Sequence, residues 1–126
     1  MADGIGFYNG STSIFNLNNE LAAGTATDSF RFGSPSSDWM AIAGDWDGSG
    51  TDTVGLYNAA LGRFFLKNTN EAGAADLDFR FGPSSSTLEA IAGDWDGDGD
   101  DTIALYDSST GIFYLKDDNS AGDADM

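Results

Sequence analysis

The stretch AIAGDWDGDGDDTIALYD, residues 90–107, places a loop of alternating aspartate and glycine between two apolar segments. Asp94, Asp96 and Asp98 stand at loop positions 1, 3 and 5, so their carboxylates can converge on one point. Glycine at position 6 permits the sharp turn that brings the backbone carbonyl of Asp100 round at position 7. Oxygen ligands in this order are typical of Ca²⁺ sites, so we expect these residues to bind calcium.

The loop matches only the first half of an EF-hand. Position 12 is Leu105, where an EF-hand has a bidentate glutamate, and both flanking segments have the pattern of strands rather than helices. We therefore expect a calcium loop inside a β-hairpin.

A second copy of the loop stands 49 residues earlier. Asp45 and Asp47 keep positions 1 and 3, but Ser49 replaces the aspartate at position 5 and Thr51 stands at position 7. Because a hydroxyl replaces a carboxylate, we expect this site to bind calcium more weakly. Asp-Gly runs also form ordinary tight turns, but turns alone do not require the alternation of carboxylates in both copies.

The repeat extends far beyond the loop. Residues 30–77 align with residues 79–126 without a gap, and about 28 of 48 positions are identical. FRFG begins both copies, at Phe30 and Phe79. Residues 1–29 follow the same register, so the chain holds about two and a half repeats.

Within one repeat the pattern predicts four short strands, at residues 40–44, 53–57, 63–67 and 77–81. No helical periodicity is visible, and 17 glycines with Asn, Asp and Ser supply the turns. A repeat of about 40 to 50 residues with four antiparallel strands is typical of a β-propeller blade. The expected fold is therefore all-β, in propeller blades of four antiparallel strands; a solenoid of repeated strands is the alternative architecture.

The segments AGDWDGDG, DTIALYD, GIFYLK and FRFG together resemble the FG-GAP and VCBS-type repeats of bacterial surface proteins. Those repeats are related to the calcium-binding blades of the integrin α-subunit propeller, and the resemblance covers nearly the whole chain. It implies that FRFG is the outermost strand of one blade and AIAGDWD the innermost strand of the next. It also implies that the calcium loop joins the first and second strands.

The same resemblance implies metal ligands at positions 1, 3, 5, 7 and 9, with aspartate usual at position 9. Here position 9 is Thr53 or Thr102, and an aspartate stands one position earlier, as Asp52 or Asp101. We expect the aspartate to close each site, and the threonine hydroxyl or a water molecule is the alternative. The tryptophans at position 2, Trp46 and Trp95, are expected to pack against their own or the neighbouring blade, and stacking on a sugar ring is the alternative.

The repeat divides the chain into three segments. Residues 1–29 form a partial blade with strands two to four, ending in FRFG at 30–33; residues 34–82 form a full blade; residues 83–126 form a partial blade with strands one to three. Propellers close with about four to eight blades. We therefore expect homo-oligomerisation, as a dimer or trimer, to complete the ring, unless the chain is a fragment of a longer protein.

The charge restricts the partners. The net charge is −16, with 21 acidic and 5 basic residues, so neither nucleic acid nor an anionic membrane surface is an expected partner. The sequence has no apolar run of membrane-spanning length, and its hydrophilic start does not resemble a signal peptide. A calcium site favours an extracellular or cell-surface location, where calcium is abundant.

An enzyme is not expected. Histidine and cysteine are absent, and most paired aspartates belong to the two loops. The sequence therefore favours a non-catalytic calcium-binding propeller module that self-assembles and acts as a binding or adhesion scaffold for a protein or glycan. The alternative is a lectin with glycan pockets between its blades.

Overall fold

A computed structural model describes residues 5–9, 12–18, 28–33, 39–83, 88–122 and 124. In this part of the chain the regular structure is entirely β-strand, and no helix is present. The described residues form ten strands, with these bounds: β1 Ile5–Asn9, β2 Ile14–Asn18, β3 Asp28–Arg31, β4 Trp39–Gly44, β5 Thr53–Asn58, β6 Arg63–Leu66, β7 Leu77–Arg80, β8 Glu89–Gly93, β9 Thr102–Asp107 and β10 Ile112–Leu115.

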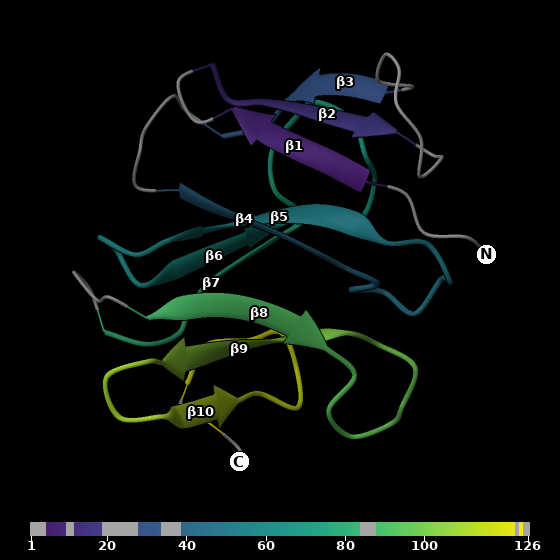
Figure 1. Cartoon of the computed structure of the whole chain (residues 1–126). Coiled ribbons are helices and arrows are strands. Elements are labelled where there is room, and N and C mark those ends of the chain that lie inside the picture. Colours follow the sequence, from purple (N-terminus) through teal and green to yellow (C-terminus); the bar gives the residue numbers. More distant parts are fainter. Residues whose placement is uncertain are drawn as a thin grey trace.

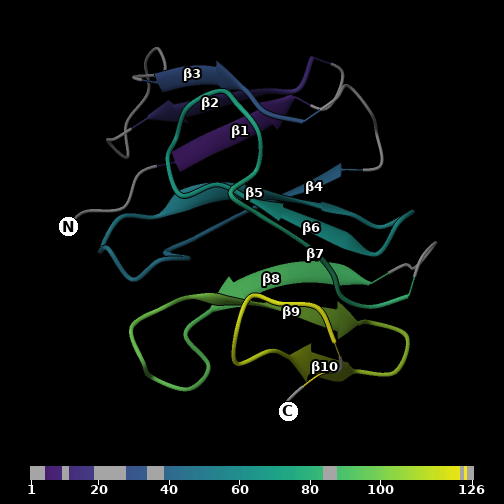
Figure 2. The same ribbon diagram turned by 180° about the vertical axis from the view of Figure 1, so that it is seen from behind.

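These strands make three antiparallel sheets, and none of them closes into a barrel. The sheets contain β1-β2-β3, β4-β5-β6-β7 and β10-β9-β8, so each strand pairs with its neighbour in sequence. They are stacked in chain order, with β1–β3 at one end and β8–β10 at the other (Figures 1 and 2). The all-β prediction is confirmed, and the four strands predicted for residues 40–81 occur within one residue of their expected ends.

Tight turns of one kind join the second and third strands of each repeat. In the middle sheet the carbonyl of Asn58 accepts hydrogen bonds from the amides of Leu61 (3.2 Å) and Gly62 (2.8 Å). Gly62 has φ +65°, a left-handed conformation that costs a residue with a Cβ atom more than it costs glycine. The matching position is Ser13 in the first repeat, which adopts φ +61° while fully buried.

Two apolar clusters hold the sheets together, and nine positions of the first recur in the second after a shift of 49 residues. The first cluster, between β1–β3 and β4–β7, contains Tyr8, Phe15, Leu17, Phe30, Phe32, Trp39, Val54, Leu56, Phe65 and Ala75. The second cluster, between β4–β7 and β8–β10, includes Tyr57, Phe64, Leu66, Phe79, Phe81, Leu88, Ile103, Leu105 and Ala124. The sequence repeat is therefore also a repeat of inter-sheet packing.

The glycine of each FRFG segment lets the sheets approach. A Cβ atom added to Gly33 would lie 2.7 Å from Cδ1 of Leu56, and one added to Gly82 would lie 2.5 Å from Cδ1 of Leu105. Both glycines also have positive φ, near +90°. No larger residue fits this position without moving the leucine of the next sheet.

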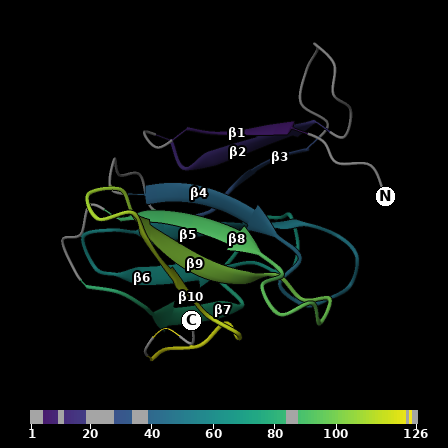
Figure 3. The same ribbon diagram turned by 60° about the horizontal axis from the view of Figure 1, so that its bottom comes forward.

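The first strands of the second and third sheets lie side by side. Strands β4 and β8 are in contact, and the amide of Ala90 donates to Sδ of Met40 at 3.2 Å. Figure 3 shows the two strands running next to each other across the sheets. The loops that follow β4 and β8 are consequently neighbours.

Candidate functional site

The loop after β8 is organised around the carboxylate of Asp94. Its Oδ1 accepts hydrogen bonds from the amides of Gly97 (2.8 Å) and Asp98 (3.0 Å), and its Oδ2 accepts one from Gly99 (3.0 Å). The amide of Asp98 also donates to Asp96 at 3.2 Å. These bonds fold the loop so that the carboxylates at loop positions 1, 3 and 5 lie close together.

Asp94, Asp96 and Asp98 come together as the sequence predicts. One oxygen from each carboxylate lies within 4.8 Å of the other two, and all three residues are exposed. Calcium binds oxygen at about 2.3–2.6 Å, so two ligands on opposite sides of one ion are about 5 Å apart. The donor atoms and their spacing therefore fit a calcium ion.

The pKa values of two carboxylates in this cluster are shifted in opposite directions. Hydrogen bonds from the amides of Gly99, Gly97 and Asp98 hold the pKa of Asp94 below its ordinary value. Partial desolvation raises the pKa of Asp96, and the negative charge of Asp98 raises it further. A divalent cation would relieve this repulsion.

The loop after β4 has the same backbone pattern with fewer carboxylates. Asp45 accepts the amides of Ser49 (2.9 Å, at Oδ1) and Gly50 (2.8 Å, at Oδ2), as Asp94 does in the other loop. Asp47 accepts the amide of Ser49 at 3.1 Å, and bonds from the side chain and amide of Ser49 lower its pKa. Ser49 and Thr51 are exposed, and the Thr51 amide lies 3.4 Å from Oγ of Ser49.

Asp100 lies over the first loop. Its Oδ1 is 2.1 Å from the place where a Cβ atom on Gly48 would stand, so the two loops touch here. Desolvation raises the pKa of Asp100, and so do the charges of Asp98 in its own loop and Asp45 in the neighbouring one. Its carboxylate thus faces acidic groups of both loops.

Asp101 joins the two loops directly. Its Oδ2 accepts the amide of Asp45 at 2.9 Å, and its own amide donates to the carbonyl of Asp45 at 2.8 Å. The cluster formed by Asp94 and its neighbours does not include Asp101. The structure therefore gives Asp101 a linking position between repeats, and the identity of the ligand that closes the second loop stays a prediction.

The side chains of the threonines at position 9 point into the sheets and not toward the loops. The hydroxyl of Thr53 donates to the carbonyl of Lys67 at 2.5 Å, and the hydroxyl of Thr102 donates to that of Lys116 at 2.6 Å. Both threonines are buried. These contacts favour a structural role for the hydroxyls.

Two asparagines support the loops and were not anticipated from the sequence. Asn70 accepts the amide of Val54 (3.1 Å) and donates to the carbonyl of Asp52 (3.2 Å), which fixes the end of the first loop. Asn119 makes the same pair of bonds, 3.2 and 3.0 Å, at the end of the second loop. Their spacing of 49 residues was the available signal.

The tryptophans at position 2 behave differently in the two loops. Trp46 is 4% exposed, and its indole N–H donates to the carbonyl of Val54 at 3.3 Å, so it packs against its own sheet as predicted. Trp95 is half-buried and lies over Gly93. Its indole N–H has no hydrogen-bond partner in the described part of the chain.

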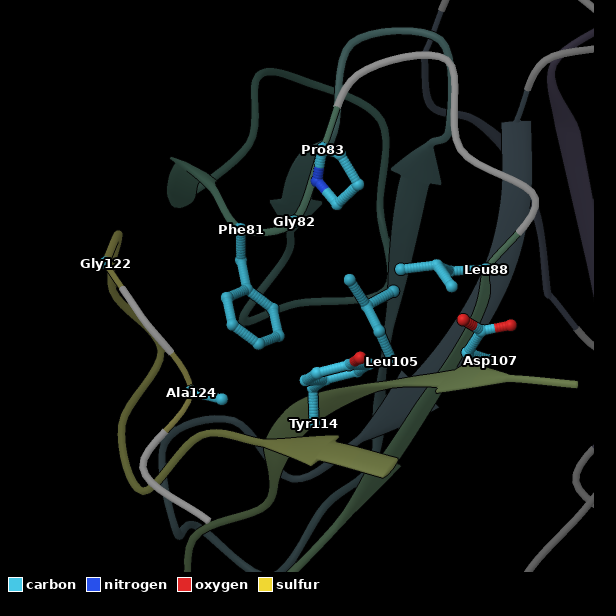
Figure 4. Close-up of a pocket in the computed structure, with 9 residues that line it drawn as sticks. All are labelled: Phe81, Gly82, Pro83, Leu88, Leu105, Asp107, Tyr114, Gly122 and Ala124. Atoms are coloured by element: carbon cyan, nitrogen blue, oxygen red, sulfur yellow. The ribbon is translucent and has the colours of Figure 1, made fainter. Parts of the chain in front are cut away.

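A pocket of about 360 Å³ opens between the second and third sheets. Figure 4 shows Phe81, Tyr114 and Leu88 around it, with the carboxylate of Asp107 beside Leu88. Hydrogen bonds from the hydroxyl (2.6 Å) and amide (2.9 Å) of Ser109 lower the pKa of Asp107. In the first cluster the position of Leu88 is held by Trp39, whose ring meets Phe65 edge-on at 5.2 Å.

Comparison with models of protein families, with curated proteins and with solved structures found no match. In the described residues no helix is long and apolar enough to cross a membrane.

Proposed function

We propose that the chain is a non-catalytic, calcium-binding β-propeller repeat module in which calcium stabilises the hairpins after β4 and β8. The observation that carries this proposal is the convergence of the Asp94, Asp96 and Asp98 carboxylates within 4.8 Å. When bound, calcium supplies positive charge that neutralises the loop. The repeated inter-sheet packing and the neighbouring strands β4 and β8 support the propeller arrangement and its likeness to FG-GAP and VCBS-type blades.

In this proposal the two loops hold calcium with different ligand sets. Asp94, Asp96 and Asp98 hold it in the second loop, while Asp45, Asp47 and Ser49 hold it in the first. Asp100 faces the first loop and can add a third carboxylate to it from the neighbouring repeat. Because Asp100 comes from another repeat, the weaker site depends on the packing of two sheets.

Thermal unfolding with and without calcium tests the proposal. At a free calcium concentration 100 times the dissociation constant, binding to the folded state adds about 2.7 kcal/mol to the free energy of unfolding. We expect the melting temperature to fall on adding EDTA at constant ionic strength and to recover with calcium. An unchanged melting temperature, together with no heat of calcium binding in calorimetry, would contradict the calcium site.

Asp96→Asn and Asp98→Asn provide the matched variants for the same experiment. Each removes one charge at an exposed position without changing the shape of the side chain much. We expect both variants to weaken calcium binding while leaving the unfolding of the calcium-free protein nearly unchanged. Glu89→Gln, at an exposed residue of β8 outside the loops, is the control for loss of charge alone.

The proposed setting is extracellular or on a cell surface, where millimolar calcium keeps such loops occupied. There the module would serve as a scaffold for binding or adhesion to a protein or glycan. The net charge of −16 opposes nucleic acid and anionic membranes as partners.

A lectin is the second candidate, and the pocket between the second and third sheets is the observation that favours it. Tyr114 offers an aromatic face on which a sugar ring can stack, and the Asp107 carboxylate can accept hydrogen bonds from hydroxyl groups. A glycan array with calcium present tests this function. We expect Tyr114→Ala and Asp107→Asn to abolish any specific signal; an array without hits would count against the lectin.

A further inference from the structure

The outer face of the β8–β10 sheet repeats a surface that is buried in the other sheets. In the middle sheet this surface packs against the next sheet and includes Tyr57, Phe64 and Leu66. Shifting by 49 residues gives the corresponding residues of the third sheet, which are Ile91, Trp95, Tyr106, Phe113 and Leu115. We call these five residues the open face.

Exposure distinguishes the open face from its two buried counterparts. Phe15 and Phe64 are 3% and 0% exposed, whereas Phe113 is 52% exposed. Tyr57 is fully buried, but Tyr106 is only half-buried. An aromatic surface of this kind on a stacked sheet is typical of an interaction site.

Two aromatic rings of the open face are already arranged as their counterparts are in the buried faces. The rings of Tyr57 and Phe64 are 4.5 Å apart at 35°, and the rings of Tyr106 and Phe113 have the same separation and angle. The Tyr8–Phe15 pair is similar, at 4.6 Å and 40°. Because the aromatic pair is formed without a covering sheet, docking requires little rearrangement.

The sequence register gives the β1–β3 sheet the counterparts of the residues that cover such a face elsewhere in the chain. The middle sheet covers the first cluster with Val54, Leu56 and Phe65, and the third sheet covers the second cluster with Ile103 and Leu105. Strand β1 carries Ile5 and Phe7 at the positions of Val54 and Leu56, and β2 carries Asn16 at that of Phe65. By sequence register, the residues for both sides of one interface therefore stand in the first and third sheets, at opposite ends of the stack.

We infer that a second copy of this chain covers the open face, placing its β1–β3 sheet where a further sheet of the stack would lie. The contact is head-to-tail, because the two surfaces differ, and it continues an interface that the chain builds twice within itself. The inference gives a surface to the self-association expected for the proposed propeller. It depends on sheet packing and not on calcium.

Light scattering coupled to size exclusion, at about 0.15 M salt to screen the negative charge, tests this contact. We expect the chain to associate with rising concentration and Phe113→Gln to abolish association. Leu61→Gln is the matched control, because Leu61 is 45% exposed but lies in the β5–β6 turn, away from the open face. A chain that stays monomeric at every concentration, or loses association equally in both variants, overturns the inference.

Mixing two blocked variants tests the head-to-tail geometry. Phe113→Gln blocks the open face and Asn16→Lys blocks the β1–β3 face, so each variant alone should be monomeric. Their equimolar mixture should form a heterodimer, because each variant keeps one intact face. A mixture that remains monomeric rejects the head-to-tail contact.

Repeating both measurements in EDTA separates this inference from the calcium proposal. Association that persists without calcium supports the open face whether or not calcium stabilises the loops. A calcium-stabilised protein that never associates overturns the open face and leaves the calcium site standing.

Discussion

The space between β1–β3 and β4–β7 holds the indole of Trp39, whereas the matching space between β4–β7 and β8–β10 holds Leu88 beside a 360 Å³ pocket. The surrounding framework is the same in both, with an FRFG glycine against a leucine of the next sheet. This glycine–leucine contact is common to both interfaces, whether the neighbouring space is filled or open. The same position thus accommodates tryptophan in one interface and leucine in the other, and the pocket lies beside the smaller residue.

Truncating the two leucines that contact the FRFG glycines should have the largest effect on stability. Leu56→Ala and Leu105→Ala remove side chains that are 0% and 1% exposed. We expect a loss of about 3–5 kcal/mol in the free energy of unfolding for Leu56→Ala and about 2–3 kcal/mol for Leu105→Ala. We expect the second loss to be smaller because Leu105 lines a pocket, and a side chain that faces empty space has fewer packing contacts to lose.

Urea unfolding of the two variants measures this difference. Similar slopes against urea are required, so that the midpoints report stability. Equal losses would show that the pocket does not weaken the packing of Leu105.

Exchanging the residues that fill the two spaces should have the next largest effect. We expect Trp39→Leu to cost about 2–3 kcal/mol, because it leaves a cavity in the first cluster. Leu88→Trp should raise the free energy of unfolding by about 0.5–2 kcal/mol, because the indole fills the pocket in the second interface. Urea unfolding provides both values, and a destabilising Leu88→Trp would mean that the second space does not accept an indole.

The two loops can be exchanged in the same way. Asp98→Ser gives the second loop the residues that the first has at positions 1, 3 and 5, and Ser49→Asp does the reverse. Because calcium affinity depends on the number of charged ligands, we expect a loss and a gain of about tenfold in affinity, respectively. Titration calorimetry measures both constants; a weaker site in Ser49→Asp would show that the first loop does not place position 5 at a metal.

Exchanging glycine and serine in the β-turns should have the smallest effect. Ser13 adopts φ +61°, and the matching Gly111 has φ +74° with nothing within 4 Å of an added Cβ atom. We expect Ser13→Gly to raise the free energy of unfolding by about 0.5–1 kcal/mol, and Gly111→Ser to lower it by a similar amount. Thermal unfolding checks both variants, and a loss in Ser13→Gly would indicate that the buried serine makes a contact worth more than the strain.

Much of this architecture could be predicted because the repeat copies whole strands. Alternating residues such as Leu77, Phe79 and Phe81 defined a strand, and the Asp94 loop defined the hairpin that follows β8. The convergence of three carboxylates also followed from spacing, since the backbone of a short loop fixes their directions. Local sequence is sufficient where local bonds determine the geometry.

Contacts between repeats were harder to predict. The sequence gives no indication that Asp101 reaches back to Asp45, because that bond depends on how β4 and β8 lie together. The pocket at Leu88 likewise depends on the distance between two sheets, which the FRFG glycine sets. A residue that differs between copies, such as Trp39 against Leu88, was visible in the alignment, but its effect on volume was not.

The two hydrogen bonds between Asp45 and Asp101 have a thermodynamic consequence for a stack of such repeats. Ordering one loop also fixes backbone atoms of the other, so the entropy of fixing them is lost only once. A cation bound in one proposed site would then raise the affinity of the next, and calcium would load the loops cooperatively. Such coupling requires no change in the conformation of either loop, because the hydrogen bonds between Asp45 and Asp101 order both loops together.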